Sequence, residues 1–126
     1  MFLSKAKKRP PEMTSPSGET LQEILGLQAG DCKSHSLAVV TIPPGKLSSA
    51  HYHKDSDESY LILSGQARLT LDKKDYKLVA GDACLIQPQE VHQIFNESDH
   101  DLIFLAVCIP AWHPDDSFDI TDSEIR

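Results

Sequence analysis

The chain has 126 residues, of which 40% are hydrophobic and 25% are charged. This composition is typical of one globular domain with a core, and it excludes a disordered or collagen-like chain. The formal net charge of −7 argues against nonspecific nucleic-acid binding, because phosphates repel an acidic surface. The apolar runs are too short to span a membrane, and no apolar segment follows the basic N-terminus as in a secretory signal. We therefore expect a cytoplasmic protein with neither a nucleic-acid nor a membrane partner.

The N-terminal segment, residues 1–18, combines basic residues with Pro10, Pro11, Pro16 and Gly18. This pattern predicts a flexible tail, or an arm that becomes ordered only against another surface. Residues 19–27, ETLQEILGL, fit two alternatives: a short helix that ends near Gly26, or a strand that enters the core.

From residue 37 onward the pattern indicates short strands separated by turn residues. Alternation and β-branched residues predict a hairpin over residues 66–79, with a polar turn between its strands. No helix alternates with these strands, which argues against a parallel sheet and favours an antiparallel sandwich or barrel. The other predicted strands are SLAVVTI, SYLILS, ACLIQ, VHQIF and DLIFLAVCI.

The cysteines are Cys32, Cys84 and Cys108, an odd number with wide spacing. They fit neither a set of disulfides nor a thiolate zinc site. Cys84 and Cys108 lie inside apolar runs, so we expect them to be small buried side chains.

The segment HYHKDSDE, residues 51–58, contains a candidate metal site. Side chains alternate along a strand, so His51 and His53 share one face and Tyr52 points to the other. The short polar loop after His53 can bring Glu58 back toward the pair, and a closed barrel can place His92 beside them. Taken alone, the His-x-His pair also fits an exposed strand. The full set of three imidazoles and one carboxylate suits a divalent transition metal and leaves coordination positions open.

The spacing of these residues resembles the two motifs of the cupin family. The first motif comprises Gly45, His51, His53, Glu58 and Gly65, and all four gaps agree. The second corresponds to residues 81–96 and contains Gly81, Pro88, His92 and Asn96. Two departures occur in the second motif: Pro88 comes one residue later than usual, and Glu90 replaces a common glycine.

The resemblance implies an all-β double-stranded β-helix, or jelly-roll barrel, formed by residues 19–118 between the N-terminal tail and an acidic C-terminal tail, residues 119–126. It implies one metal ion per chain in the barrel mouth, bound by His51, His53, Glu58 and His92. The ion could be Fe, Mn, Ni, Co, Zn or Cu. The resemblance also implies a homodimer, and a role for Asn96 in holding a turn rather than binding metal.

We interpret the protein as a metal-dependent enzyme that acts on a small organic molecule, with dioxygenase-like chemistry favoured. The alternatives are a sugar or sugar-phosphate isomerase and a non-enzymatic module that binds a small ligand or metal. A sugar phosphate requires a nearby cation, and the candidates are Arg68, Lys46 and Lys54, of which the two lysines are expected to face solvent.

Other residues near the site have open roles. Alternation from Glu58 places Tyr60 and Ile62 on the inner face, where Tyr60 could line the pocket or serve the core. Trp112 and His113 could cover the barrel mouth or pack against a partner chain. His113, His35 and His100 are expected to be surface residues rather than ligands.

Overall fold

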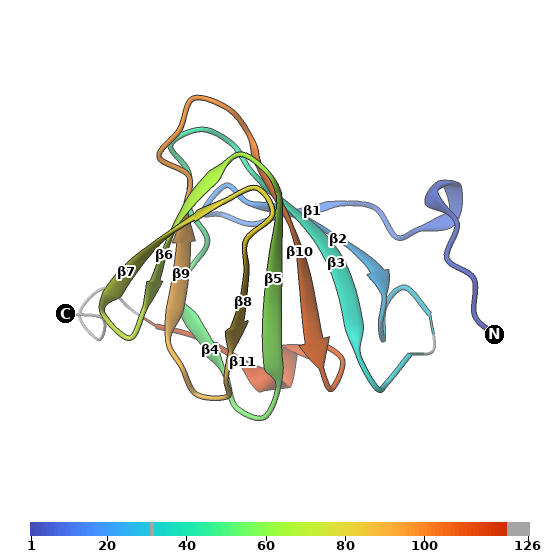
Figure 1. Cartoon of the computed structure of the whole chain (residues 1–126). Helices are drawn as coiled ribbons and strands as arrows, with labels where there is room; N and C mark the ends of the chain where they lie inside the picture. The colour runs from blue at the N-terminus through green and yellow to red at the C-terminus, as the bar shows by residue number, and fades with distance from the viewer. Residues whose placement is uncertain (31, 121–126) are drawn as a thin grey trace.

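The computed structural model describes residues 1–30 and 32–120 and contains two antiparallel sheets that face each other (Figure 1). One sheet has the strand order β1-β2-β3-β10-β5-β8 and the other β11-β4-β9-β6-β7. The strands of the first sheet are β1 (Met13–Thr14), β2 (Thr20–Leu25), β3 (Ser36–Ile42), β10 (Leu102–Ile109), β5 (Asp57–Ser64) and β8 (Ala83–Ile86). Those of the second are β11 (Ser117–Asp119), β4 (His51–His53), β9 (His92–Phe95), β6 (Gln66–Leu71) and β7 (Lys74–Val79). Two 3-10 helices, η1 (Ala6–Lys8) and η2 (Pro114–Asp116), complete the described elements.

The core lies between the two sheets and follows from period-two alternation. Along β3 and β10 every second residue is buried, which is the pattern that an antiparallel sheet with one inner face requires. The largest fully buried side chains include Phe104, Ile42 and Ile62 from one sheet and Ile94 from the other. The prediction of an all-β jelly-roll barrel is confirmed by this arrangement.

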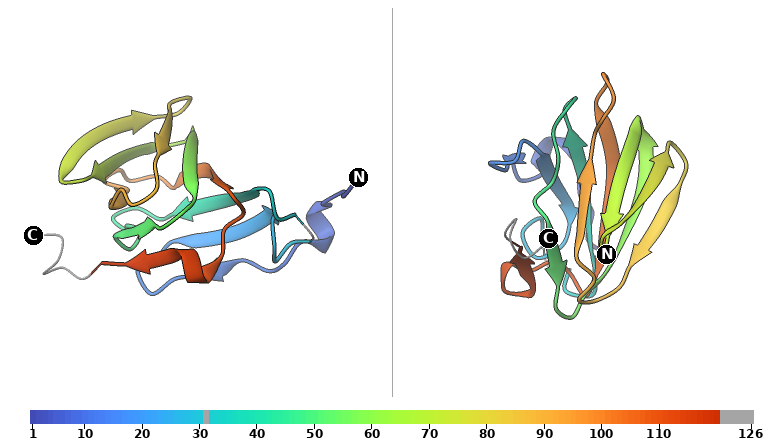
Figure 2. Two further views of the ribbon diagram at one scale, coloured as in Figure 1. Left: turned by 90° about the horizontal axis from the view of Figure 1, so that it is seen from below. Right: turned by 90° about the vertical axis from the view of Figure 1, so that its left-hand side faces the viewer.

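The strands β2 and β11, which come from near the two ends of the chain, lie on the same side of the barrel (Figure 2), and residues of both border one cavity. Residues 20–25 form β2, so the predicted segment 19–27 adopts its strand alternative rather than a helix. Part of the N-terminal segment is β1, which pairs with β2. The strand β11 pairs with β4 and includes Asp119, the first residue of the predicted acidic tail. Residues 121–126 of that tail lie outside the described residues.

Turns fall where the sequence places them. The hairpin of β6 and β7 closes through Asp72 and Lys73, both with positive φ. Gly65 separates β5 from β6 at φ 89°, and a Cβ atom there would lie 2.7 Å from the carbonyl oxygen of Asp101. Only glycine fits this turn without strain.

Asn96 follows β9 and has the structural role expected for it. Its side-chain amide donates to the carbonyls of Ile42 (2.9 Å) and His100 (2.7 Å), and its oxygen accepts from the Ser98 amide (2.9 Å). The side chain is fully buried, so these bonds hold the loops at one end of the barrel. In the part of the chain that the structure describes, no helix is long and apolar enough to cross a bilayer.

Candidate metal centre

Three strands from both sheets bring the four predicted residues together. His51 and His53 lie on β4, His92 opens β9, and Glu58 comes from β5 in the facing sheet. His51 and His92 are direct partners across the β4–β9 pair. Each of the four residues offers one ligand atom, and these atoms lie within 4.8 Å of one another.

The separations match those of ligands around a single ion. Glu58 Oε1 lies 3.0 Å from His92 Nε2 and 3.2 Å from His53 Nε2. Ligands at about 2.0–2.2 Å from a metal lie about 3 Å apart when adjacent and about 4 Å apart when opposite. The two Glu58 distances fit adjacent ligands, so the cluster could hold a metal ion.

Backbone carbonyls orient two of the imidazoles. The Nδ1 atom of His51 lies 2.9 Å from the Ser49 carbonyl oxygen, and that of His92 lies 3.0 Å from the Glu90 carbonyl oxygen. A proton on each Nδ1 leaves the Nε2 lone pair available, which is the arrangement common to metal-binding histidines. His53 differs, because its Nδ1 is buried and has no hydrogen-bond partner among the described residues. This atom is on the other side of the ring from the Nε2 that faces Glu58.

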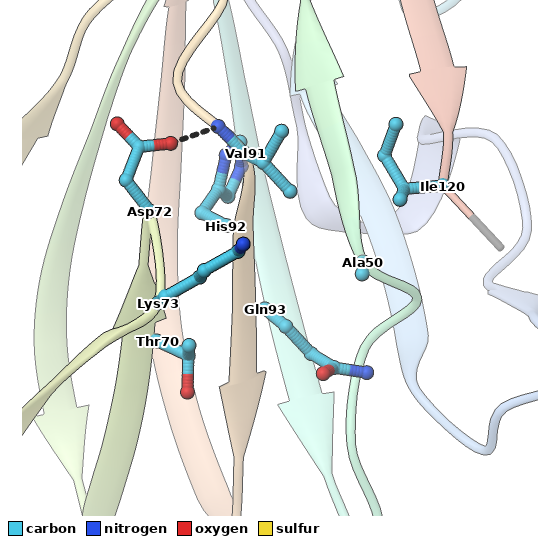
Figure 3. A pocket seen from close by; sticks show the side chains of 8 residues that line it. All are labelled: Ala50, Thr70, Asp72, Lys73, Val91, His92, Gln93 and Ile120. Atoms are coloured by element: carbon cyan, nitrogen blue, oxygen red, sulfur yellow. Dashed lines mark hydrogen bonds between the residues drawn. The ribbon is translucent and has the colours of Figure 1, made fainter. Parts of the chain in front are cut away.

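The segment before β9 fixes the position of His92 (Figure 3). The Val91 amide donates to Asp72 Oδ1 at 3.1 Å, and the Asp72 amide donates to the Val91 carbonyl at 2.9 Å. In the preceding turn, Glu90 accepts a hydrogen bond from the Gln87 amide, and Gln89 adopts a φ of 70°. Glu90, where a glycine is common, thus closes this turn through its side chain.

The protonation states of Glu58 and His51 suit metal binding. Burial would raise the pKa of Glu58, but its contacts with the His53 and His92 imidazoles outweigh burial and hold that pKa well below its usual range. Burial and the neighbouring His92 lower the pKa of His51 to about 4, so His51 is neutral at neutral pH. Burial would lower the pKa of His53, and its contact with Glu58 raises it overall. An ionised carboxylate and a neutral imidazole are the forms that bind cations.

Cys108 and Tyr60 lie next to Glu58. The thiol of Cys108 donates to Glu58 Oε2 at 3.3 Å, and the two residues face each other across β10 and β5. Tyr60 is 4% exposed and packs against Phe104, with ring centroids 4.6 Å apart. Burial, followed by the charge of Glu58, raises the pKa of Tyr60 well above its usual value. Tyr60 therefore stays protonated, and it serves both the core and the pocket.

A cavity of about 390 Å³ opens above the cluster. Its walls include Tyr60, Phe104 and Val40, and Trp112 also borders it. Residues from near both ends of the described chain also line it: Met13, Thr14, Ser15, Glu19, Ser117 and Asp119. Of these, Met13, Thr14, Ser15 and Asp119 lie in the segments predicted as flanking tails, so parts of those segments border the pocket.

The remaining predicted residues lie elsewhere. Arg68 faces outward, where it pairs with Glu97 and, at 3.5 Å, with Asp75. Lys54 borders a different pocket, beside Tyr52. His113 accepts a hydrogen bond from the Asp115 amide, and the His100 side chain is 85% exposed. His113 and His100 are thus surface residues, as expected.

Three residues of the site have no signal in the sequence pattern: Cys108, Glu19 and Asp119. Cys108 looks like any small apolar residue of a strand, and Asp119 looks like part of an acidic tail. The contacts of Cys108 and Asp119 depend on strand pairings over long distances in the chain, which local patterns do not encode.

The family model described as "Cupin domain" matches residues 38–108. The chain belongs to the cupin family. This match includes all four residues of the cluster, and it confirms the resemblance seen in the two motifs. The cupin barrel brings the cluster into its mouth in the way described above.

Similar proteins support the same assignment. The chain is 35% identical over 98 residues to the oxalate-binding protein of Thermotoga maritima, covering 77% of this chain and 81% of that protein. A crystal structure of a predicted oxalate decarboxylase from the same organism is 29% identical, with a TM-score of 0.71. The match covers 86% of this chain and 99% of that one. The structure of Pac13, a nucleoside dehydratase, matches with a TM-score of 0.78 at 16% identity. The match covers 98% of this chain and 97% of that one, and it shows similarity of fold alone.

Proposed function

We propose that this cupin binds one divalent transition-metal ion through His51, His53, Glu58 and His92, and that it is a metal-dependent enzyme for a small organic molecule. The single observation that carries the proposal is the convergence of four ligand atoms within 4.8 Å at the base of a cavity.

When bound, the ion would act as a Lewis acid or, if it is iron or manganese, would support chemistry with dioxygen. The chain itself supplies orientation and an apolar lining. Backbone carbonyls hold the His51 and His92 rings, and Phe104, Tyr60 and Trp112 line the cavity. Tyr60 remains a hydroxyl donor rather than a base.

Oxygen chemistry remains our preferred reaction class, ahead of isomerisation of a sugar phosphate. Among the described residues, no lysine or arginine borders the cavity. A phosphate ester inside this cavity would then lack the cation that normally holds it. Lys73 borders a different pocket, beside His92 (Figure 3). The oxygen chemistry stays a proposal that rests on the open coordination positions and the apolar walls.

A binding module without turnover is the second candidate. It is favoured by the relative that is named for binding oxalate, to which most of this chain aligns. A metal site can also serve only to stabilise a fold. Oxygen consumption by the metal-loaded protein with candidate substrates, compared with anaerobic controls, separates the two candidates.

The primary test is the metal content of protein purified without a histidine tag. We expect close to one equivalent of a divalent ion per chain, and a large loss in His92→Ala. The surface variant His100→Ala should behave as wild type. Less than about a tenth of an equivalent, with no difference between wild type and His92→Ala after reconstitution, would contradict the proposal.

Cys108 is expected to tune the site through Glu58. Its thiol donates a hydrogen bond to Glu58 Oε2, while Glu58 Oε1 faces the histidines. Cys108→Ala should lower metal affinity by about 10-fold, at the low end for loss of a supporting hydrogen bond, because a thiol is a weak donor. Cys108→Ser retains a donor and should keep most of the affinity. Equal affinities in all three proteins, measured by competition with a chelating dye, would count against this role.

The homodimer expected from the family also belongs to this proposal. Leu61, Leu63 and Leu85 on the outer face of the first sheet are 39%, 47% and 58% exposed. Leu61 lies opposite Leu105 in the neighbouring strand, which extends this apolar surface. Exposed apolar patches of this kind are typical of protein interfaces. Light scattering should then give twice the monomer mass of 14.0 kDa.

The cytoplasmic location stays a prediction.

A further inference from the structure

The loop between two of the candidate metal ligands is bound by an acidic residue from the C-terminal part of the chain. Residues 54–56 join His53, the last residue of β4, to β5, in which Glu58 is the second residue. Asp116, at the end of η2, contacts this loop with both its backbone and its side chain. It accepts hydrogen bonds from three successive amides: Lys54 to its carbonyl oxygen (2.9 Å), Asp55 to Oδ1 (2.8 Å) and Ser56 to Oδ2 (3.1 Å).

These contacts give the loop a defined shape. Successive backbone amides that point at one carboxylate form a concave anion-binding site, and hydrogen bonds to a charged acceptor are stronger than those between neutral groups. At the far end of the loop, Ser56 is 2% exposed, and its hydroxyl donates to the Pro110 carbonyl at 3.1 Å. At the near end, the His53 carbonyl accepts from the Gln89 amide at 2.7 Å. The loop is therefore held at both ends as well as by Asp116.

The segment that carries Asp116, residues 114–120, continues along β4, the strand of His51 and His53 (Figure 1). The strand β11 pairs with all of β4, from His51 to His53. On its other side, the register of β4 with β9 comprises His51 and His92. The C-terminal segment is thus the more extensive backbone partner of the short strand that presents two of the candidate ligands.

Small displacements of this backbone matter for a metal site. Ligand atoms must be held to within about 0.5 Å of the productive geometry, so the backbone under each ligand needs a fixed support. Without the Asp116 carboxylate, the amides of Asp55 and Ser56 would turn to water, and the loop could adopt several shapes. The 3.2 Å separation of His53 Nε2 and Glu58 Oε1 would then no longer be fixed by the loop that links the two residues.

We propose that Asp116 is a positioning residue of the metal site, which holds the loop between His53 and Glu58 in the shape that metal binding requires. Asp116 acts through the loop amides and is not one of the four residues whose ligand atoms converge. The inference rests on the proposed function, because it assumes that His53 and Glu58 bind a metal ion. It adds to that function a role for the C-terminal segment in setting the metal affinity.

The test compares the Zn²⁺ affinities of wild type, Asp116→Ala and Asp116→Asn by competition with a chelating dye. Asp116→Ala should bind Zn²⁺ about 10-fold more weakly, at the low end for loss of a supporting partner. Asp116→Asn keeps one acceptor oxygen but turns an amide donor toward the other loop N–H, so its affinity should fall by about threefold or more. Titrations at about 1 M salt, where the screening length is about 3 Å, largely remove the effect of the lost charge itself.

A second measurement separates positioning from a general loss of stability. The titrations are made where circular dichroism shows the metal-free variant to be folded, because a purely structural residue leaves the affinity of the folded state unchanged. The visible absorption of Co²⁺-loaded protein reports the ligand geometry, and it should shift in Asp116→Ala. Asp115→Ala is the matched control: Asp115 is the neighbouring carboxylate on η2, its side chain is 91% exposed, and the variant should keep the wild-type affinity and spectrum.

The outcomes separate this inference from the proposed function. Wild-type Zn²⁺ affinity in folded Asp116→Ala overturns the inference while metal binding stands. If Asp116→Ala does not fold, wild-type affinity in Asp116→Asn has the same meaning. An equal loss in Asp115→Ala also overturns the inference, because the effect would then come from acidic charge and not from the loop. Absence of Zn²⁺ binding in wild type overturns the proposed function and the inference together.

Discussion

Replacing His53 with alanine is expected to lower the affinity for a divalent metal ion by more than about 100-fold, the upper end of what loss of a supporting hydrogen bond costs. His53 is one of four groups around the site, and its Nε2 atom lies 3.2 Å from Glu58 Oε1. Its removal also withdraws a hydrogen bond that keeps the pKa of Glu58 low. Titration of metal-free protein with Zn²⁺ or Co²⁺ against a competing chelator measures this change.

The control for this prediction is His35→Ala. His35 contacts Ser34 in the loop before β3 and is not one of the four residues of the cluster. Its metal affinity should equal that of the wild type. Both variants should unfold cooperatively without metal, so that a loss of affinity is not a loss of fold. Wild-type affinity in folded His53→Ala would exclude His53 as a ligand.

Truncation of Phe104 to alanine is expected to lower the free energy of unfolding by about 3–5 kcal/mol. Phe104 is 1% exposed, lies in the core between the sheets and packs against Tyr60. Its ring is large, and the surrounding β-sheets can collapse only partly into the space that it leaves. Urea denaturation of the metal-free protein measures the change without a contribution from metal binding.

Tyr76→Ala is the matched control, because Tyr76 is also aromatic and lies on a strand but is 47% exposed. Its cost should stay below about 1 kcal/mol, as is usual for surface positions. Similar losses in the two variants would mean that Phe104 is not a main element of the core.

Local patterns and the two motifs were sufficient to find the candidate ligands. The alternation of His51, Tyr52 and His53 places the two imidazoles on one face, and Tyr52 instead stacks on Phe118 with centroids 5.3 Å apart. The inward positions of Tyr60, Ile62 and Ile94 follow from the same rule and agree with their burial. These features depend on neighbours in the chain, which is why the sequence is sufficient to predict them.

The residues that contact the candidate ligands from other strands, and those that line the cavity from near the chain ends, could not be predicted from local patterns. Cys108 reaches Glu58 because β10 pairs with β5 in one register, and Asp119 reaches the cavity because β11 pairs with β4 beside His51. A shift of either register by one residue would turn these side chains to the opposite face. Nothing within a few residues of Cys108 or Asp119 specifies such a register.

The amino-acid sequence by itself determined the strand-rich fold, the cupin motifs and the identity of the four residues that could hold a metal. Those features arise from period-two alternation, turn residues and fixed spacings, all of which are local. Only the tertiary structure decided that segments near both ends of the described chain line the cavity, and that Cys108 contacts Glu58. The physical reason is that pairing between distant strands depends on the packing of both sheets around one core, and this packing is a property of the whole chain.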